Sequence, residues 1–127
     1  MDRIAELAAK TDQRKLAFWA AGCAERVLPH FEKKYPKDNR PRKAIEAARA
    51  WVRGELSVGK ARSAAFASHA AARDAEEGAA RAAARAAGHA VATAHVAGHA
   101  VHAANYAAAA AVPEERNWQY RRLLALQ

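Results

Sequence analysis

Alanine dominates this sequence and constrains its fold more than any other feature. It supplies roughly a third of the 127 residues, far above ordinary usage, and residues 79–87 are alanine interrupted only by arginine. Alanine is the best helix former and a poor strand former. Large apolar side chains are sparse, so the core must come from the close approach of alanine-lined helices. The sequence therefore predicts an all-α protein, a compact bundle of about five to six helices.

Turn-forming residues divide the chain into segments that suit one domain. We expect a single helical domain over residues 1–127, with its core at about residues 12–125. Apolar residues recur at helical spacing between these turns. The pattern predicts a short helix at about residues 2–9 and longer helices at about residues 12–35, 41–55 and 58–75. A further helix runs from residue 79 into a histidine-rich stretch that a step at Gly98 can split, followed by helices at about residues 100–111 and from Pro113.

The stretch Ala86–Val112 contains no Lys, Arg, Asp or Glu and is long enough to span a bilayer. It is mostly alanine, which gives little transfer free energy, and its histidines and Asn105 would be costly in hydrocarbon. We therefore expect a buried helical hairpin and no membrane contact. The N-terminus lacks the apolar core of a signal peptide, and the single thiol of Cys23 suits a reducing compartment, so we expect a cytoplasmic protein.

The single cysteine also limits the chemistry of the chain. Cys23 alone cannot form an internal disulfide or a cysteine-built zinc site. It shares a helical face with Trp19 and Val27, which is typical of a small apolar core residue. The sequence has no glycine-rich phosphate loop and no Gly-x-Ser-x-Gly elbow. We find no catalytic constellation, and we expect neither enzymatic activity nor a cofactor.

The histidines are the residues with the most chemical potential. His95, His99 and His102 are spaced i, i+4, i+7 and share one face if the helix continues through Gly98. With His69 they form a candidate pocket. Imidazoles at i and i+4 can share a metal, yet the stretch has no carboxylate and no His-Glu-x-x-His pattern. Three interpretations stay open: hydrogen-bonded anchors between helices, which we favour, a ligand pocket, and a metal site completed from elsewhere.

A formal net charge of +8 predicts a basic surface. The candidate partner-binding residues are Lys37, Arg40, Arg42, Arg49 and Arg53. The last three form a helical stripe with Glu46, for which we expect intrahelical ion pairs. Such a surface can be simply solvated, or it can meet an acidic protein or nucleic acid. Because no aromatic residues interleave these cations and no helix-turn-helix emerges, we favour a protein partner over nucleic acid.

Several stretches occur in an order that is more specific than any single alanine-rich piece. They are Cys23–Glu32, Tyr35–Pro36, Asp38–Pro41 and Ala44–Trp51 in the first half, then Ala86–Val96, Glu115–Arg116 and Trp118–Gln119. With these motifs the chain resembles, from about residue 16 to 124, a family of bacterial immunity proteins, the Imm-five-like domain of polymorphic toxin systems.

The resemblance implies a single all-α domain in the bacterial cytoplasm that binds and neutralises a cognate toxin stoichiometrically. It carries over no catalytic residue. The charge of +8 then predicts a toxin surface that is acidic or neutral. A monomer and a dimer both suit the small-residue helix faces. Two alternatives stay open: a basic nucleic-acid-binding helical protein, and a histidine-lined ligand- or metal-binding helical protein.

Overall fold

The computed structural model describes residues 2–111 and 114–127, and it contains no strand in these ranges. The described chain forms the helices α1 (Arg3–Ala9), α2 (Gln13–Glu32), α3 (Arg40–Val52), α4 (Val58–Asp74), α5 (Ala79–Ala92), α6 (His99–Ala110) and α7 (Glu115–Ala125). The all-α class is confirmed. In these ranges the helices number seven rather than five to six, because the predicted short N-terminal helix forms as α1 and the histidine-rich stretch splits completely. The predicted helix start at Pro113 lies outside the described residues.

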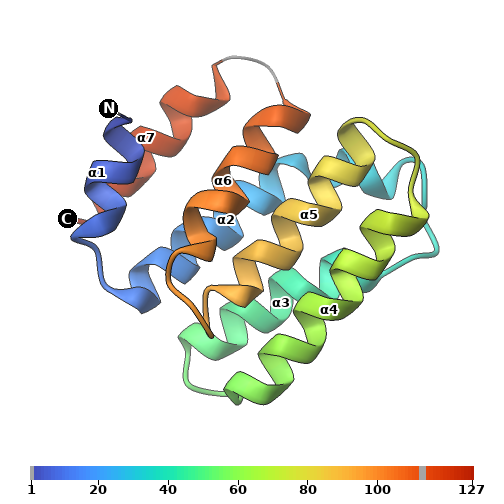
Figure 1. Ribbon diagram of the computed structural model, residues 1–127, viewed down its shortest axis with the longest axis horizontal. Coiled ribbons are helices and arrows are strands. Elements are labelled where there is room, and N and C mark those ends of the chain that lie inside the picture. Colours follow the sequence, from blue (N-terminus) through green and yellow to red (C-terminus); the bar gives the residue numbers. More distant parts are fainter. Residues whose placement is uncertain (1, 112–113) are drawn as a thin grey trace.

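The helices form two layers and a lateral pair (Figure 1). α4, α5 and α6 lie side by side in one layer. α2 and α3 pack against one face of this layer, with α2 against α5 and α6, and α3 against α4 and α5. α1 and α7 pack together at the side of the bundle where both termini lie. Among the described residues no helix covers the outer face of the α4–α6 layer, so this face meets solvent.

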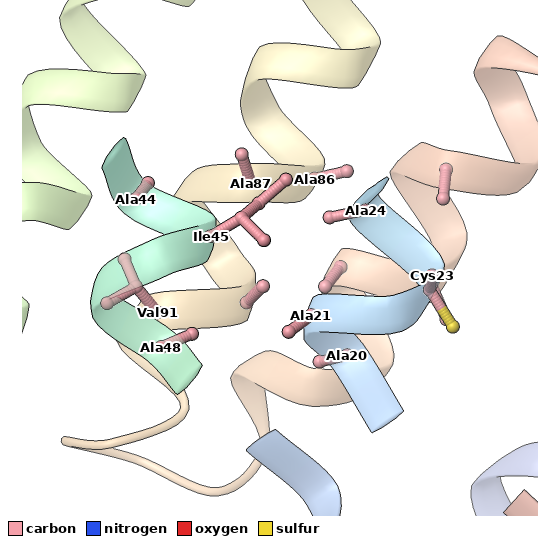
Figure 2. Packing of buried hydrophobic residues seen from close by; sticks show 14 of the residues in the cluster. Ala20, Ala21, Cys23, Ala24, Ala44, Ile45, Ala48, Ala86, Ala87 and Val91 are labelled. Carbon is pink, nitrogen blue, oxygen red and sulfur yellow. The ribbon is translucent and has the colours of Figure 1, made fainter. Parts of the chain in front are cut away.

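Alanine lets the helix backbones approach closely in the core (Figure 2). Ala21 and Ala24 of α2 and Ala86 and Ala87 of α5 are completely buried where the two helices meet. Ile45 of α3 reaches into the same region and is also completely buried. A core of small side chains keeps its packing density only if the helices stay close together. The alanine composition is therefore the direct cause of the tight two-layer arrangement.

Cys23 is a buried core residue, as its helical spacing predicts. Trp19 and Val27, on the same face of α2, are buried with it. Burial raises the pKa of the Cys23 thiol, and the nearby Glu115 carboxylate raises it further. The thiol therefore stays protonated and out of reach of solvent, which is the state of an inert structural cysteine.

Side-chain caps and one glycine set the helix ends. The Asp12 carboxylate accepts a backbone N–H bond of 2.9 Å from the first turn of α2. The Ser57 hydroxyl does the same for α4, at 3.2 Å. α3 ends at Val52, short of the predicted residue 55, because Gly54 adopts a φ of +77° that a helix does not allow.

A turn over residues 93–98 separates α5 from α6. Gln13 of α2 holds this turn, because its side-chain amide donates to the carbonyls of Thr93 (2.9 Å) and Ala94 (3.2 Å). α5 and α6 therefore form the predicted hairpin, but it is buried on one side only, because none of the described helices covers the outer face of the α4–α6 layer. The helix does not continue through Gly98, so the single face expected for His95, His99 and His102 is not formed. None of the described helices is long and apolar enough to cross a membrane.

Candidate functional site

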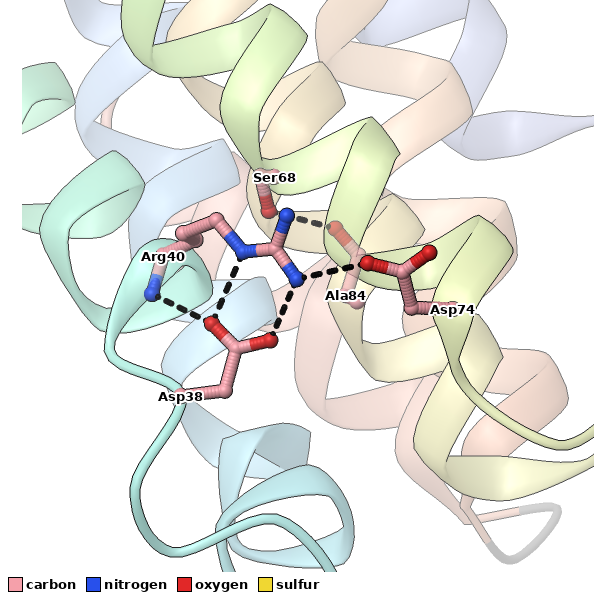
Figure 3. Close-up of polar contacts among 5 residues, drawn as sticks. All are labelled: Asp38, Arg40, Ser68, Asp74 and Ala84. Carbon is pink, nitrogen blue, oxygen red and sulfur yellow. Dashed lines mark hydrogen bonds and ion pairs between the residues drawn. The ribbon is translucent and has the colours of Figure 1, made fainter.

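Arg40 joins the loop before α3 to the end of α4 (Figure 3). Its Nε and Nη2 donate to the two carboxylate oxygens of Asp38 at 2.9 and 2.7 Å, and Nη2 also donates to Asp74 at 3.0 Å. These bonds hold the pKa of the Asp38 carboxyl below its ordinary value. In the same view Ser68 of α4 donates to the Ala84 carbonyl of α5 at 2.9 Å. Arg40 therefore forms its ion pairs within the protein.

Arg42 and Arg49 are held by glutamates of α2. Arg42 donates to Glu32 at 2.8 Å and to Glu25 at 3.3 Å, and Arg49 donates to Glu25 at 2.6 Å. The hydrogen bond from Arg49 lowers the pKa of Glu25. The expected intrahelical pairs with Glu46 are wrong, because Glu46 forms no ion pair with a described residue. The pairs cross between helices because α2 packs beside α3 and presents its glutamates to the arginines.

Arg53 and Lys37 complete the predicted partner-binding set. Arg53 donates to Glu55 at 2.8 Å, and both side chains are exposed. Lys37 lies in the exposed loop before α3 and forms no ion pair with a described residue. Four of the five predicted cations therefore have a carboxylate partner within the chain. Much of the unpaired positive charge lies on other surfaces.

A groove of about 310 Å³ opens between α2 and α7. Phe18, Arg49 and Trp118 help to line it, and Phe18 is 46% exposed. The guanidinium of Arg26 lies 4.2 Å from the centre of the Trp118 ring, and that of Arg122 lies 5.8 Å from it. Arginine and large aromatic side chains are enriched at the energetic centres of protein interfaces. Sequence reasoning missed this groove because its two walls are far apart in the chain.

Four histidines and a tyrosine gather on the outer face of the α4–α6 layer. The centre is the His89 ring of α5, which lies 4.8 Å from His69 of α4. On α6 the rings of His99 and His102 lie 5.1 and 5.4 Å from it. Tyr106 stacks on His89 at 5.3 Å with an interplanar angle of 7°. We call these five residues the histidine cluster.

Sequence reasoning missed His89 as the centre of the cluster. Its partners on α6 follow only after the turn at residues 93–98, so no helical spacing connects them. The histidine in the turn itself, His95, is exposed and lies outside the cluster. It lines a neighbouring cavity of about 140 Å³ together with Arg62, Phe66, His69 and His99. Three of the four predicted pocket histidines therefore line one cavity, while His102 belongs to the cluster alone.

Hydrogen bonds constrain the positions of the ring protons. Arg85 Nη1 lies 3.2 Å from His69 Nδ1. Because arginine only donates, His69 Nδ1 accepts, and the proton of the neutral ring sits on Nε2. His89 Nδ1 and His99 Nδ1 are 2.9 Å apart, so one donates and the other accepts. These contacts link α4 to α5 and α5 to α6, which is the anchoring role expected for such residues.

The cluster disfavours protonation. Burial lowers the pKa of His69 to about 4, and the charge of Arg85 contributes next. Burial also lowers the pKa of His89 to about 4, with repulsion from a protonated His69 ring as the second cause. The pKa of His99 is lowered mainly by burial. All three rings are therefore neutral at pH 7. Across residues 2–111 and 114–127, no three His, Cys, Asp or Glu side chains are arranged to bind one metal ion.

The fold and these surfaces define a small all-α protein that presents an arginine- and aromatic-lined groove and a histidine-rich face. Residues 6–126 match the family described as "Imm-5 like putative immunity protein". The match spans nearly the whole chain, so the protein belongs to this family and the resemblance is confirmed. Comparison with curated proteins and with solved structures gives no match.

Proposed function

We propose that this protein is an immunity protein that binds and neutralises a cognate bacterial toxin stoichiometrically, without catalysis of its own. The observation that carries the proposal is the family match over residues 6–126. The buried, protonated thiol of Cys23 agrees with a binding role, because it is not an activated nucleophile.

We propose the groove between α2 and α7 as the contact site. Arg49, from the predicted partner-binding set, lines this groove together with Arg122, which forms no ion pair with a described residue. Trp118 and the half-exposed Phe18 supply large aromatic surface between these charges. The groove thus suits a toxin surface that places a carboxylate beside an apolar side chain.

The remaining predicted cations take a supporting place in this proposal. Arg40 and Arg42 are committed to carboxylates of the fold, and exposed Arg53 and Lys37 do not line the groove. Arg49 also pairs with a carboxylate, but its partner Glu25 lines the groove beside it, so a bound surface can reach both side chains. Charges away from the contact mainly raise the association rate, while a charge inside the contact affects dissociation. The five residues therefore act unequally in the proposal, with Arg49 as the central one.

The test begins with capture of the partner from native lysate by the tagged protein, at moderate and high salt, with identification by mass spectrometry. The captured protein is then expressed in a sensitive strain with and without the immunity protein. We expect growth inhibition that equimolar immunity protein relieves, and a 1:1 complex. Growth inhibition that persists beside the folded protein contradicts the function. Recovery of nucleic acid alone, lost at high salt, supports the nucleic-acid alternative instead.

The groove is tested with charge-reversal variants of the same protein. R49E combined with R122E should weaken the complex by roughly 100-fold or more if the groove is the central contact. R53E is the matched control, because Arg53 is exposed, pairs only with Glu55, and does not line the groove. Undiminished neutralisation by the double variant would overturn the contact site while leaving the immunity function intact.

A further inference from the structure

The outer face of the α4–α6 layer carries positive charge without carboxylates to balance it. Arg62 and Arg73 of α4 and Arg85 of α5 form no ion pair with a described residue. Between residues 58 and 110 the only acids are Asp74, Glu76 and Glu77. These acids pair with Arg40, Lys34 and Arg81, respectively. The histidine cluster therefore lies among arginines whose charge nothing in the described chain neutralises.

Side chains that can donate hydrogen bonds line the cavity beside the cluster, and they come from three elements. Arg62 and His69 come from α4, His95 from the turn and His99 from α6. The His69 proton sits on Nε2, because Nδ1 accepts from Arg85. With about 140 Å³ the cavity is smaller than the roughly 300–1,000 Å³ of ordinary small-molecule sites, and it suits an ion or a single functional group.

The same contacts disfavour a cation in this place. A metal ion requires free imidazole lone pairs, but that of His69 Nδ1 is occupied by Arg85. One of the two Nδ1 lone pairs of His89 and His99 is likewise used between the rings. The neighbouring guanidinium groups would also repel a divalent cation. An anion in the cavity can instead accept hydrogen bonds from its lining and neutralise the charge of Arg62, the arginine that lines it.

We propose that the cavity between α4, the 93–98 turn and α6 binds a tetrahedral oxyanion of the phosphate type through Arg62, His69, His95 and His99. Potential donors on three different elements suit an anion with oxygens on several sides better than a planar carboxylate. Bound anion stabilises the protonated imidazoles, so affinity rises as the pH falls. The site lies on a different face from the groove between α2 and α7, and it requires no toxin.

The anion has two possible sources, free phosphate and a phosphate monoester. The cavity has no room for a large organic group, which would lie outside it. Phe66 lines the rim, is 64% exposed, and has the Arg62 guanidinium 5.9 Å from its ring centre. An aromatic group attached to the phosphate would stack on this ring. A monoester should therefore gain affinity from Phe66, and free phosphate should not.

The experiment titrates the full-length protein with inorganic phosphate, sulfate and phenyl phosphate by calorimetry, with histidine ring signals followed by NMR. We expect saturable 1:1 binding with shifts of the His69 and His99 signals. The charge of sulfate does not change between pH 5.5 and pH 7.5, and sulfate should bind about tenfold tighter at pH 5.5 than at pH 7.5. R62Q should weaken binding at least tenfold, while R81Q should not, because Arg81 lies on α5, pairs with Glu77 and does not line the cavity.

Every outcome decides the proposal. Tighter binding of phenyl phosphate than of phosphate, erased by F66A, identifies a monoester, and equal binding identifies the free anion; both support the site. Absence of saturable binding at millimolar anion overturns it, as does equal weakening by R62Q and R81Q. An oligonucleotide that binds more tightly than phosphate and is indifferent to R62Q also overturns it. Circular dichroism of each variant verifies that the helices are intact.

Discussion

Acid should destabilise this protein before its carboxylates titrate, because the folded state keeps His69 and His89 neutral. Both pKa values lie at about 4 in the folded protein, against about 6.5 for histidine in an unfolded chain. Between these values the unfolded state binds more protons. The free energy of unfolding therefore has its full value above pH 6.5 and decreases as the pH falls from 6.5 to about 4. The carboxyls with lowered pKa, Glu25 and Asp38, cost stability only nearer pH 4 and below.

The size of the effect follows from the same values. A histidine pKa lowered from 6.5 to about 4 costs about 2 kcal/mol of unfolding free energy at pH 5 relative to pH 8. Solvent screens both half-buried rings, and repulsion between them enters both shifts, so we halve this value for each ring. The pair then costs about 2 kcal/mol, which lowers the melting temperature by about 8 °C. The facing groups Arg73, Arg85, His99 and His102 act in the same direction.

The assay is urea unfolding at pH 8 and pH 5 in a chloride solution without phosphate or sulfate, followed by circular dichroism. H89Q should flatten the dependence on pH, because it removes the ring at the centre of the cluster. H30Q should leave it unchanged, because His30 lies exposed on α2 outside the cluster. Equal stability at the two pH values, or flattening by H30Q, would refute the reasoning.

Two further predictions concern packing. G88A places a Cβ 2.7 Å from the His69 ring and should lower the free energy of unfolding, measured with urea, by about 1–3 kcal/mol. G22A places its Cβ at an ordinary 3.7 Å contact with Trp118 and should raise the free energy of unfolding by up to about 1 kcal/mol through helix propensity. Equal effects of the two substitutions would contradict this prediction. Q119L should cost about 1–3 kcal/mol in the same assay, since the buried Gln119 amide donates to the Ala104 carbonyl at 2.9 Å and accepts from Arg116 at 3.0 Å, and leucine removes both bonds. An unchanged midpoint would be inconsistent with this role.

The helices themselves could be predicted from local sequence. Asp12 and Ser57 accept hydrogen bonds from the first turns that follow them, and alanine favours the helix between such ends. The buried face of Trp19, Cys23 and Val27 also follows from spacing alone. These features depend on neighbours within one helix, which is why sequence reasoning reaches them. The family could be identified for a related reason, because its motifs are ordered along the chain.

The candidate sites depend on contacts between helices, which spacing does not encode. Arg42 and Arg49 pair with Glu25 across the α2–α3 contact, although Glu46 shares their helix. His89 meets α6 only because the turn at residues 93–98 reverses the chain.

The helical class, most of the helix positions and the apolar faces follow from the sequence alone, because alanine content and i, i+3, i+4 spacing act within a few residues. Which arginines remain unpaired and which histidines share a surface depends on how the helices pack together. The physical reason is distance: ion pairs and ring contacts act over a few ångströms in space, whatever the separation of the residues along the chain.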